Sequence, residues 1–207
     1  DNGSPMGADF LESSADIYIR NSDNRGYCKA VNQGFQAATG NLLSVMNNDI
    51  RVSNNWLSIS KEIFDQNPKV GSIHFRMIPY EQDFKPGKDT WISGKERWAH
   101  ASFYVIRKEA IPDGGYITKF QEGGYDDYEF FHRMRDINGW QQAYTNSVEF
   151  QHRDSSTYLA LDDRDKNRAE RDAKNRDIYK QIHGEYPDEQ FAKLFPNQMK
   201  EAWKPFP

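Results

Sequence analysis

Two neighbouring carboxylates, Asp126 and Asp127, lie at the junction of a glycine-rich stretch, 112–126, and a segment with helical periodicity, 128–137. A carboxylate in a cleft can take a proton from a hydroxyl as that hydroxyl attacks. The pair is therefore a candidate general base. The alternative is structural, because carboxylates at a helix N-terminus bind its free N–H groups and favour its dipole.

A second polar cluster, Asn47-Asn48-Asp49, directly follows the short apolar run 42–46. In open α/β sheets, ligands bind beyond the carboxyl ends of strands, and hard cations such as Mg²⁺ or Mn²⁺ prefer oxygen ligands. Asp49 is thus a candidate metal ligand, and Asn47 or Asn48 could bond a sugar hydroxyl. The alternative is a polar turn, where Asn and Asp are favoured.

The third candidate is His152, at the end of a segment, 142–152, that predicts one or two short strands. A neutral imidazole is a common metal ligand, so His152 could complete a site that Asp49 begins. The alternative is a structural histidine, which is the more frequent role of a lone His.

The segments that would position these residues alternate between strand and helix patterns. Strands are predicted at 15–20, 42–46, 70–78, 101–107 and 142–152, and helices at 24–39, from Trp56 to Pro68, and at 128–137. The stretch 79–97 is rich in Pro, Gly and charge and predicts a loop. This alternation favours an α/β sheet with helices on both of its faces.

Composition excludes several classes of protein. Among 207 residues, 27 Lys+Arg and 31 Asp+Glu give a net charge of -4, which disfavours a generic nucleic-acid binder. The single cysteine, Cys28, excludes an internal disulfide and disfavours a Cys-based zinc site. No apolar run approaches the ~18–20 residues of a membrane span, and we see no signal peptide, so a cytoplasmic location is expected.

The last quarter of the chain differs in composition from the rest. Residues 162–177 contain six acids and six bases, a mixture that is typical of a solvated helix face. We therefore expect a catalytic domain at 1–157 and a charged helical extension at 158–207.

Several motifs occur together in an order that is more specific than any one of them. The stretch NRGYCKAVNQGFQAATGNLLSVMNND carries N-x-G, A-x-N-x-G and A-x-G patterns and ends in an acidic motif. Further on come YDDYEFFHR, the pair Gly139-Trp140, and His152. From residue 1 to about 157 the chain resembles the family-2 glycosyltransferases of GT-A fold. The resemblance implies a Rossmann-like mixed sheet, from which the family's first strand is missing here, and we expect native sequence upstream of Asp1.

The resemblance also implies a mechanism. Asp1 would lie near the nucleotide base, Asn47 or Asn48 would contact the ribose, and Asp49 would bind Mn²⁺ or Mg²⁺ together with the donor pyrophosphate. His152 would be a further metal ligand. Asp127, which matches the Asp of the family's Glu-Asp pair, would deprotonate the acceptor hydroxyl, with Asp126 in the place of the Glu. The hydroxyl would displace the nucleoside diphosphate with inversion.

Further expectations concern partners and departures from the family pattern. Trp98 and His100 could line the acceptor or donor-sugar pocket, although simple packing is an alternative for Trp98. The expected partners are a nucleotide-sugar donor and a saccharide or other hydroxyl acceptor. The motif Asn-Asn-Asp retains one carboxylate where the family has Asp-x-Asp, and Ile117, Thr118 and Lys119 replace the Phe-Asp-Glu of another family motif.

Two other functions compete with sugar transfer. A nucleotidyltransferase could use a related sheet and a metal, but no Gly-rich phosphate loop with a Lys is visible. A non-catalytic carbohydrate-binding domain on a degenerate transferase fold is conceivable because of the Asn-Asn-Asp motif; Asp127 and His152 argue against it.

Overall fold

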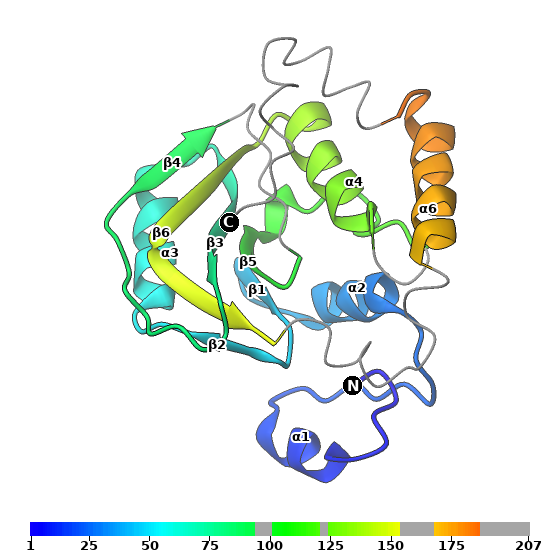
Figure 1. The fold of residues 1–207 in the computed structure, drawn as a ribbon, viewed down its shortest axis with the longest axis horizontal. Helices are drawn as coiled ribbons and strands as arrows, with labels where there is room; N and C mark the ends of the chain where they lie inside the picture. The colour runs from blue at the N-terminus through cyan, green and yellow to red at the C-terminus, as the bar shows by residue number, and fades with distance from the viewer. Residues whose placement is uncertain (94–100, 121–123, 154–167, 187–207) are drawn as a thin grey trace.

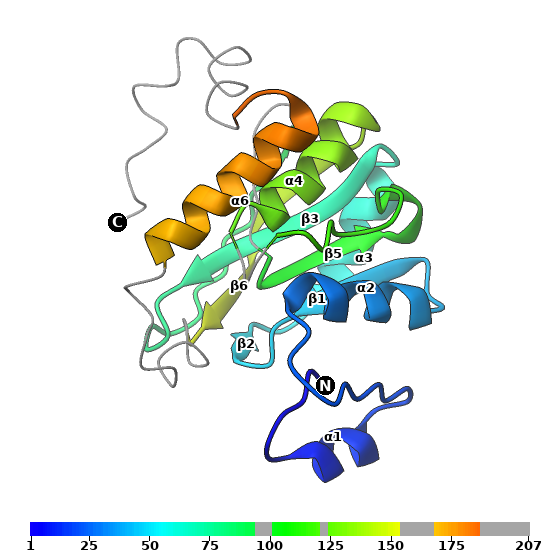
Figure 2. The same ribbon diagram turned by 90° about the vertical axis from the view of Figure 1, so that its right-hand side faces the viewer.

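The computed structural model describes residues 1–93, 101–120, 124–153 and 168–186, and it contains a mixed sheet with helices on both faces (Figures 1 and 2). The strands are β1 (Leu42–Met46), β2 (Ile50–Val52), β3 (Val70–Ile78), β4 (Thr90–Ser93), β5 (Phe103–Arg107) and β6 (Gln141–His152). The helices are α1 (Ala8–Ser14), α2 (Tyr27–Ala37), α3 (Trp56–Gln66), α4 (Asp126–His132) and α6 (Arg168–His183). Two short turns complete the set: the 3-10 turn η1 (Lys108–Ala110) and the π-helical turn η2 (Arg133–Ile137), which continues α4.

The sheet is organised around its longest strand, β6. The strand order is β1-β5-β3-β6-β2, and β4 also pairs with β6. The β3–β6 pair is parallel, whereas the other pairs are antiparallel. The first part of β6 pairs with β4 and its last part pairs with β2, where Ile50 lies opposite His152. This register brings the end of β6 beside the chain that leaves β1.

Each face of the sheet has its own apolar core, and β5 shows how one strand serves both. Phe103 and Val105 pack with α3, whereas Tyr104 and Ile106 pack with α2 and α4. This follows from the alternation of side chains along a strand. The two cores confirm the expected arrangement of helices on both faces.

The outer helix α6 lies against α4 rather than against the sheet (Figures 1 and 2). Tyr179 is fully buried, and its ring lies 5.6 Å from that of Tyr128 in α4. The charged extension thus contains a helix, and one side of that helix is covered by α4.

Three local predictions differ from the structure. The segment 15–20 forms no strand; its backbone instead bonds residue 1, with Ile19 O accepting from the Asp1 amine at 2.8 Å and Asn21 N–H donating to Asp1 O at 2.9 Å. The expected loop 79–97 contains β4, which is held by pairing with β6. The one or two strands expected at 142–152 form one strand of 12 residues.

Candidate active site

One part of the candidate site lies where β1 and β6 end. Oδ1 of Asp49 is 3.0 Å from Nε2 of His152, and Nδ2 of Asn47 is 3.2 Å from the same nitrogen. The side chains of Asp49 and His152 remain 19% and 14% exposed, so a ligand can reach them. The structure thus brings together three predicted residues from distant parts of the sequence.

Backbone hydrogen bonds hold this cluster in place. Asn47 N–H donates to Ser102 O at 2.8 Å, and Arg153 N–H donates to Asp49 O at 3.0 Å. Asn48, between the two, is exposed on the turn. Of the two asparagines predicted to contact a ribose, only Asn47 is therefore in contact with the histidine.

The donor set suits a hard or borderline cation that completes its coordination from other sources. Asp49 supplies a carboxylate and His152 an imidazole nitrogen, both of which Mn²⁺ accepts. Within the described ranges, no group of three or more His, Cys, Asp and Glu residues could hold a metal. A cation here would take further ligands from waters or from phosphate oxygens, as Mg²⁺ commonly does.

The second part of the candidate site is the start of α4. The chain enters this helix through Gly124 and Tyr125, both with positive φ, at 95° and 66°. Asp126 follows and is buried, with 4% of its surface exposed, and the Cys28 thiol lies 3.5 Å from its Oδ2. Asp127 accepts the Tyr128 N–H at 2.7 Å on Oδ1.

The surroundings of the two carboxyls change their proton affinity. Burial raises the pKa of Asp126. Burial, together with the neighbouring charge of Asp126, raises the pKa of Asp127 to about 8. A general base works best when its pKa lies near the working pH. The pKa of Asp127 thus lies in the range that suits a general base.

Three tyrosines beneath the acid pair were not singled out from the sequence. Tyr104 OH and Tyr116 OH are 3.0 Å apart, and Tyr27 OH donates to Ala101 O at 2.7 Å. Burial raises the pKa of all three, and the carboxylates add to this. These hydroxyls stay protonated, so they add polar groups but no charge near Asp127.

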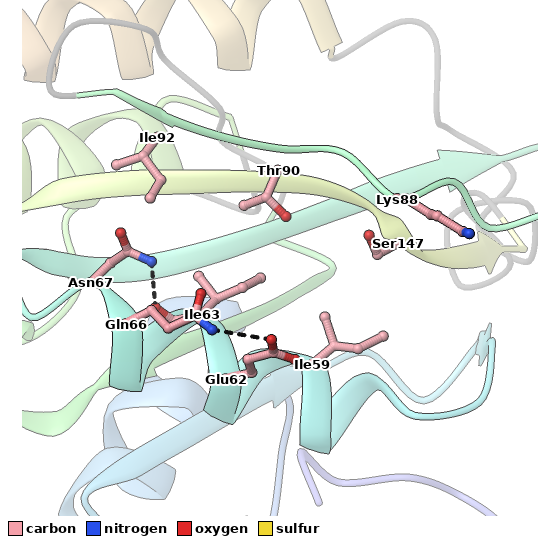
Figure 3. Close-up of a pocket in the computed structure, with 9 residues that line it drawn as sticks. All are labelled: Ile59, Glu62, Ile63, Gln66, Asn67, Lys88, Thr90, Ile92 and Ser147. Atoms are coloured by element: carbon pink, nitrogen blue, oxygen red, sulfur yellow. Dashed lines mark hydrogen bonds between the residues drawn. The ribbon is translucent and has the colours of Figure 1, made fainter.

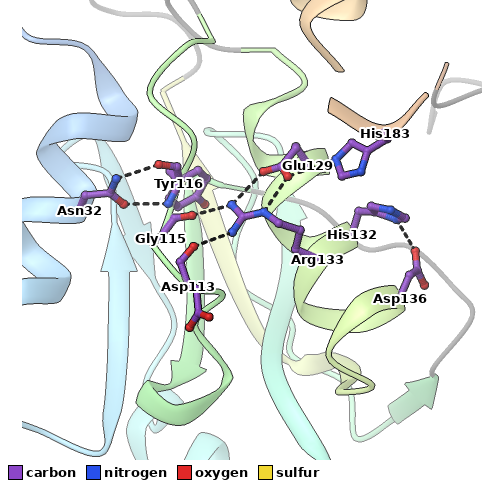
Figure 4. Close-up of polar contacts among 9 residues, drawn as sticks. All are labelled: Asn32, Asp113, Gly115, Tyr116, Glu129, His132, Arg133, Asp136 and His183. Carbon is purple, nitrogen blue, oxygen red and sulfur yellow. Dashed lines mark hydrogen bonds and ion pairs between the residues drawn. The ribbon is translucent and has the colours of Figure 1, made fainter. Parts of the chain in front are cut away.

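Arg133, the first residue of η2, joins α4 to the glycine-rich stretch before it (Figure 4). Arg133 binds both carboxylate oxygens of Glu129, at 2.6 and 2.9 Å, and also donates to Gly115 O at 2.6 Å and Asp113 O at 3.1 Å. His183 Nε2 lies 3.2 Å from Glu129 Oε1. Burial alone would raise the pKa of Glu129, but His183 and Arg133 outweigh it and lower the pKa. The Glu and Arg of the YDDYEFFHR motif therefore hold the helix that carries the acid pair.

The remaining predicted residues lie elsewhere. The Asp1 side chain is fully buried; its carboxylate accepts Ser4 N–H and Tyr18 OH, both at 2.9 Å, and pairs with Arg20 at 3.2 Å. Its contacts thus hold the first turn to the segment after α1. Trp98 and His100 lie outside the described residues.

The two parts of the site lie toward the same end of the sheet. α4 runs opposite to β6, so the first turn of α4 and the carboxyl end of β6 point the same way (Figures 1 and 2). A pocket of about 280 Å³ lies on the other face, between α3 and the β4–β6 pair (Figure 3). Its lining includes Glu62, Gln66 and Lys88 and none of the predicted site residues.

Comparison with solved structures identifies the fold. A crystal structure of GalNAc-T7 with UDP, GalNAc and Mn²⁺ superposes with a TM-score of 0.52 at 15% identity, covering 65% of this chain and 31% of that one. A crystal structure of S. aureus TarS, residues 1–349, gives 0.55 at 11% identity, covering 95% and 61%. The fold is that of the GT-A glycosyltransferases, and this chain spans less than two thirds of either structure.

The sequence gives the family. Residues 9–125, more than half of the chain, match the model for glycosyl transferase family 2. The chain belongs to this family, as the motif order implied. No curated protein sequence gave a significant match. Among the described residues, no helix is long and apolar enough to cross a membrane.

Proposed function

We propose that this chain transfers a sugar from a nucleotide-diphosphate sugar to an acceptor hydroxyl, with inversion at the anomeric carbon and with Asp127 as the general base. The observation that carries the proposal is the Asp126–Asp127 pair, with Asp126 buried and Asp127 partly exposed, at the start of α4, which lies toward the same end of the sheet as the end of β6. Family membership supports the reaction class.

Each residue has a distinct task in this proposal. Asp127 takes the proton of the attacking hydroxyl, because burial and Asp126 give it a pKa of about 8. Asp126 is too buried to act on substrate itself, and its charge keeps the proton affinity of Asp127 high. Asn47, or Asn48, contacts the ribose. Asp1 lies near the nucleotide base and holds the Asp1–Ser4 turn there through its carboxylate.

Asp49 and His152 would hold Mn²⁺ or Mg²⁺. When bound, this cation supplies charge neutralisation to the departing nucleoside diphosphate. The presence of UDP and Mn²⁺ in the GalNAc-T7 structure supports both the donor class and the cation.

A donor screen tests the proposal. Nucleotide sugars are incubated with the protein and Mn²⁺, and thermal stabilisation and release of nucleoside diphosphate are followed. A ligand that binds only the native state raises the melting temperature. Release of nucleoside diphosphate by the native chain and its loss in Asp127→Asn would support the proposal. Release of pyrophosphate instead would indicate nucleotidyl transfer, and binding without any turnover would indicate a carbohydrate- or nucleotide-binding domain.

A further inference from the structure

Helix α6 presents a face of polar and aromatic side chains to the start of α4, although half of its residues are charged. Asn175, Tyr179 and His183 are spaced four residues apart and so lie on the same side of the helix. Each contacts the segment that carries the acid pair: Asn175 contacts Gly124, Tyr179 contacts Tyr128, and His183 contacts Glu129. This face of α6 therefore contacts the segment 124–129 along its whole length.

The contact nearest to the acids is made by Asn175. This side chain is fully buried, and its Nδ2 donates to Gly124 O at 2.9 Å. Gly124 has a φ of 95°, and a Cβ there would lie 3.2 Å from Asp172 Oδ1 and 3.8 Å from Asn175 Nδ2. Asn175 thus binds a backbone turn that closely approaches α6 and that needs glycine.

Gly124 in turn contacts the acid pair. Gly124 lies two residues before Asp126, and its backbone N–H acts to lower the pKa of that carboxyl, against the larger effect of burial. Asn175 on α6 therefore binds the carbonyl of Gly124, and the amide of the same Gly124 favours ionised Asp126. If Gly124 moved, both the Asp126 carboxylate and the first turn of α4, which includes Asp127, would lose this support.

We propose that Asn175 is a positioning residue for the Asp126–Asp127 pair, so that α6 completes the catalytic site from outside the part of the chain that matches the family. This inference rests on the proposed function, in which Asp127 is the base. Asn175 touches no reacting atom; it acts through Gly124.

The effect of Asn175 is one of geometry rather than charge. The titratable groups that face Asp126 are Cys28 on α2, Asp127 on α4 and, more distantly, three tyrosines (Tyr27, Tyr104 and Tyr116). Asp172 on α6 faces Gly124. Asn175 is neutral, so its removal leaves all of these charges unchanged. Its removal releases the Gly124 carbonyl, which weakens the support that Gly124 gives to ionised Asp126, so the proton affinity of the pair should rise.

The experiment compares two variants of Asn175 with a matched control. Asn175→Ala removes the donor, and Asn175→Leu removes it with little change of shape and no added charge. Asn67→Ala removes the same kind of bond, from an Asn Nδ2 to a backbone carbonyl (Ile63 O, 2.8 Å), at the end of α3 on the other face of the sheet. Melting temperature, donor Kd, kcat and the pH dependence of kcat/KM are measured for each, using the nucleotide sugar found in the screen.

We expect both Asn175 variants to lose roughly 10–100-fold in kcat, the scale that misplacement of a reacting group produces. Donor Kd should stay within a factor of about two, and the pH inflection should move upward. Asn67→Ala should keep native kcat and native inflection even if its melting temperature falls as far. An equal kcat loss in Asn67→Ala, or native kcat and inflection in both folded Asn175 variants, would overturn the inference.

The two failures are distinguishable. If Asp127→Asn abolishes turnover while Asn175→Leu, folded and binding donor, behaves as the native chain, the positioning role is wrong and the proposed function stands. If Asp127→Asn turns over normally, or the native chain shows no turnover with any donor, the proposed function fails, and the inference fails with it.

Discussion

Nε2 of His152, the last residue of β6, lies 3.0 Å from Oδ1 of Asp49, although the two residues are far apart in the sequence. The antiparallel pairing of Ile50 with His152 produces this contact, because it sets the residue before Ile50 beside the end of β6. The pair is therefore a consequence of strand register, and a change that shifted β2 against β6 would separate the two side chains.

Asp49→Ala should abolish the metal dependence of donor binding and lower activity by orders of magnitude, because the variant loses the only carboxylate of this cluster. His152→Ala should have the same effect more mildly, since the carboxylate remains. Calorimetric titration with a nucleoside diphosphate, with and without Mn²⁺, measures this. Unchanged Mn²⁺ dependence in Asp49→Ala would show that the cation is bound elsewhere.

Asp127→Asn should lower kcat by about 10²–10⁴-fold, the usual contribution of a general base, while donor Kd is kept. The amide preserves shape but does not accept the proton. Asp126→Asn should have a smaller effect, since Asp126 is buried and acts on its neighbour. If Asp126→Asn is the inactive variant and Asp127→Asn retains turnover, the two roles are reversed.

The pH dependence of kcat/KM should show a limb with an apparent pKa of about 8, far above the ordinary value for an aspartate. The base must be ionised to act, so activity falls as the pH drops below this value. In Asp126→Asn the inflection should move to lower pH, because the like charge that raises the pKa of Asp127 is gone. An inflection that is the same in both proteins would exclude this coupling.

The same shift has a consequence for stability. The pKa of Asp127 is higher in the folded chain than the unfolded value of about 3.9. The stability that protonated Asp127 allows is therefore fully present below pH ~3.9, and it is lost as the pH rises through 8. Asp127→Asn should therefore gain stability relative to the native chain as the pH rises from 5 to 9. Denaturant titrations at the two pH values measure the difference, and a constant difference would contradict the raised pKa.

Arg133→Met should lower the free energy of unfolding by about 3–5 kcal/mol, the scale for breaking a buried ion pair. It leaves Glu129, whose side chain is fully buried, with His183 as its remaining partner in the group shown in Figure 4. Lys61→Met is the control, because Lys61 and Asp65 form an ion pair with the same spacing whose side chains are 69% and 60% exposed. That change should cost less than about 1 kcal/mol. Equal losses would show that burial of Glu129 does not matter.

Much of the fold could be predicted because the decisive signals are local. The apolar run 42–46 and the helix that begins at the acid pair are both observed, as are α3 and the strand 70–78. β2 was not predicted, because its three residues are too few to show an alternation of apolar and polar side chains. β4 lies in a stretch of turn-forming residues and is held by a bond from Thr90 Oγ1 to Thr145 Oγ1 and by its ladder with β6, which no local pattern encodes.

The candidate site was predictable in part for the same reason. Asp49, His152 and Asp127 each mark the end or start of an element, so their types and places could be read together. The tyrosine cluster and Asn175 could not be found in this way. Tyr104 looks like any apolar strand residue, and Asn175 lies in a segment of mixed charge with no apolar stripe. Their partners are set by packing between elements that are distant in sequence.

The central place of β6 affects the order in which the molecule can assemble. Its parallel partner β3 ends at Ile78, whereas β6 begins at Gln141, so the β3–β6 pairing closes a long loop. Closing this loop costs chain entropy, which the contacts between the two strands must offset. β3 and β5 can pair earlier, since the stretch of chain between Ile78 and Phe103 is much shorter. The contact between His152 and Asp49 needs the pairing of β2 with β6, so a nascent chain that has not yet emerged beyond β6 carries Asp49 without His152 beside it.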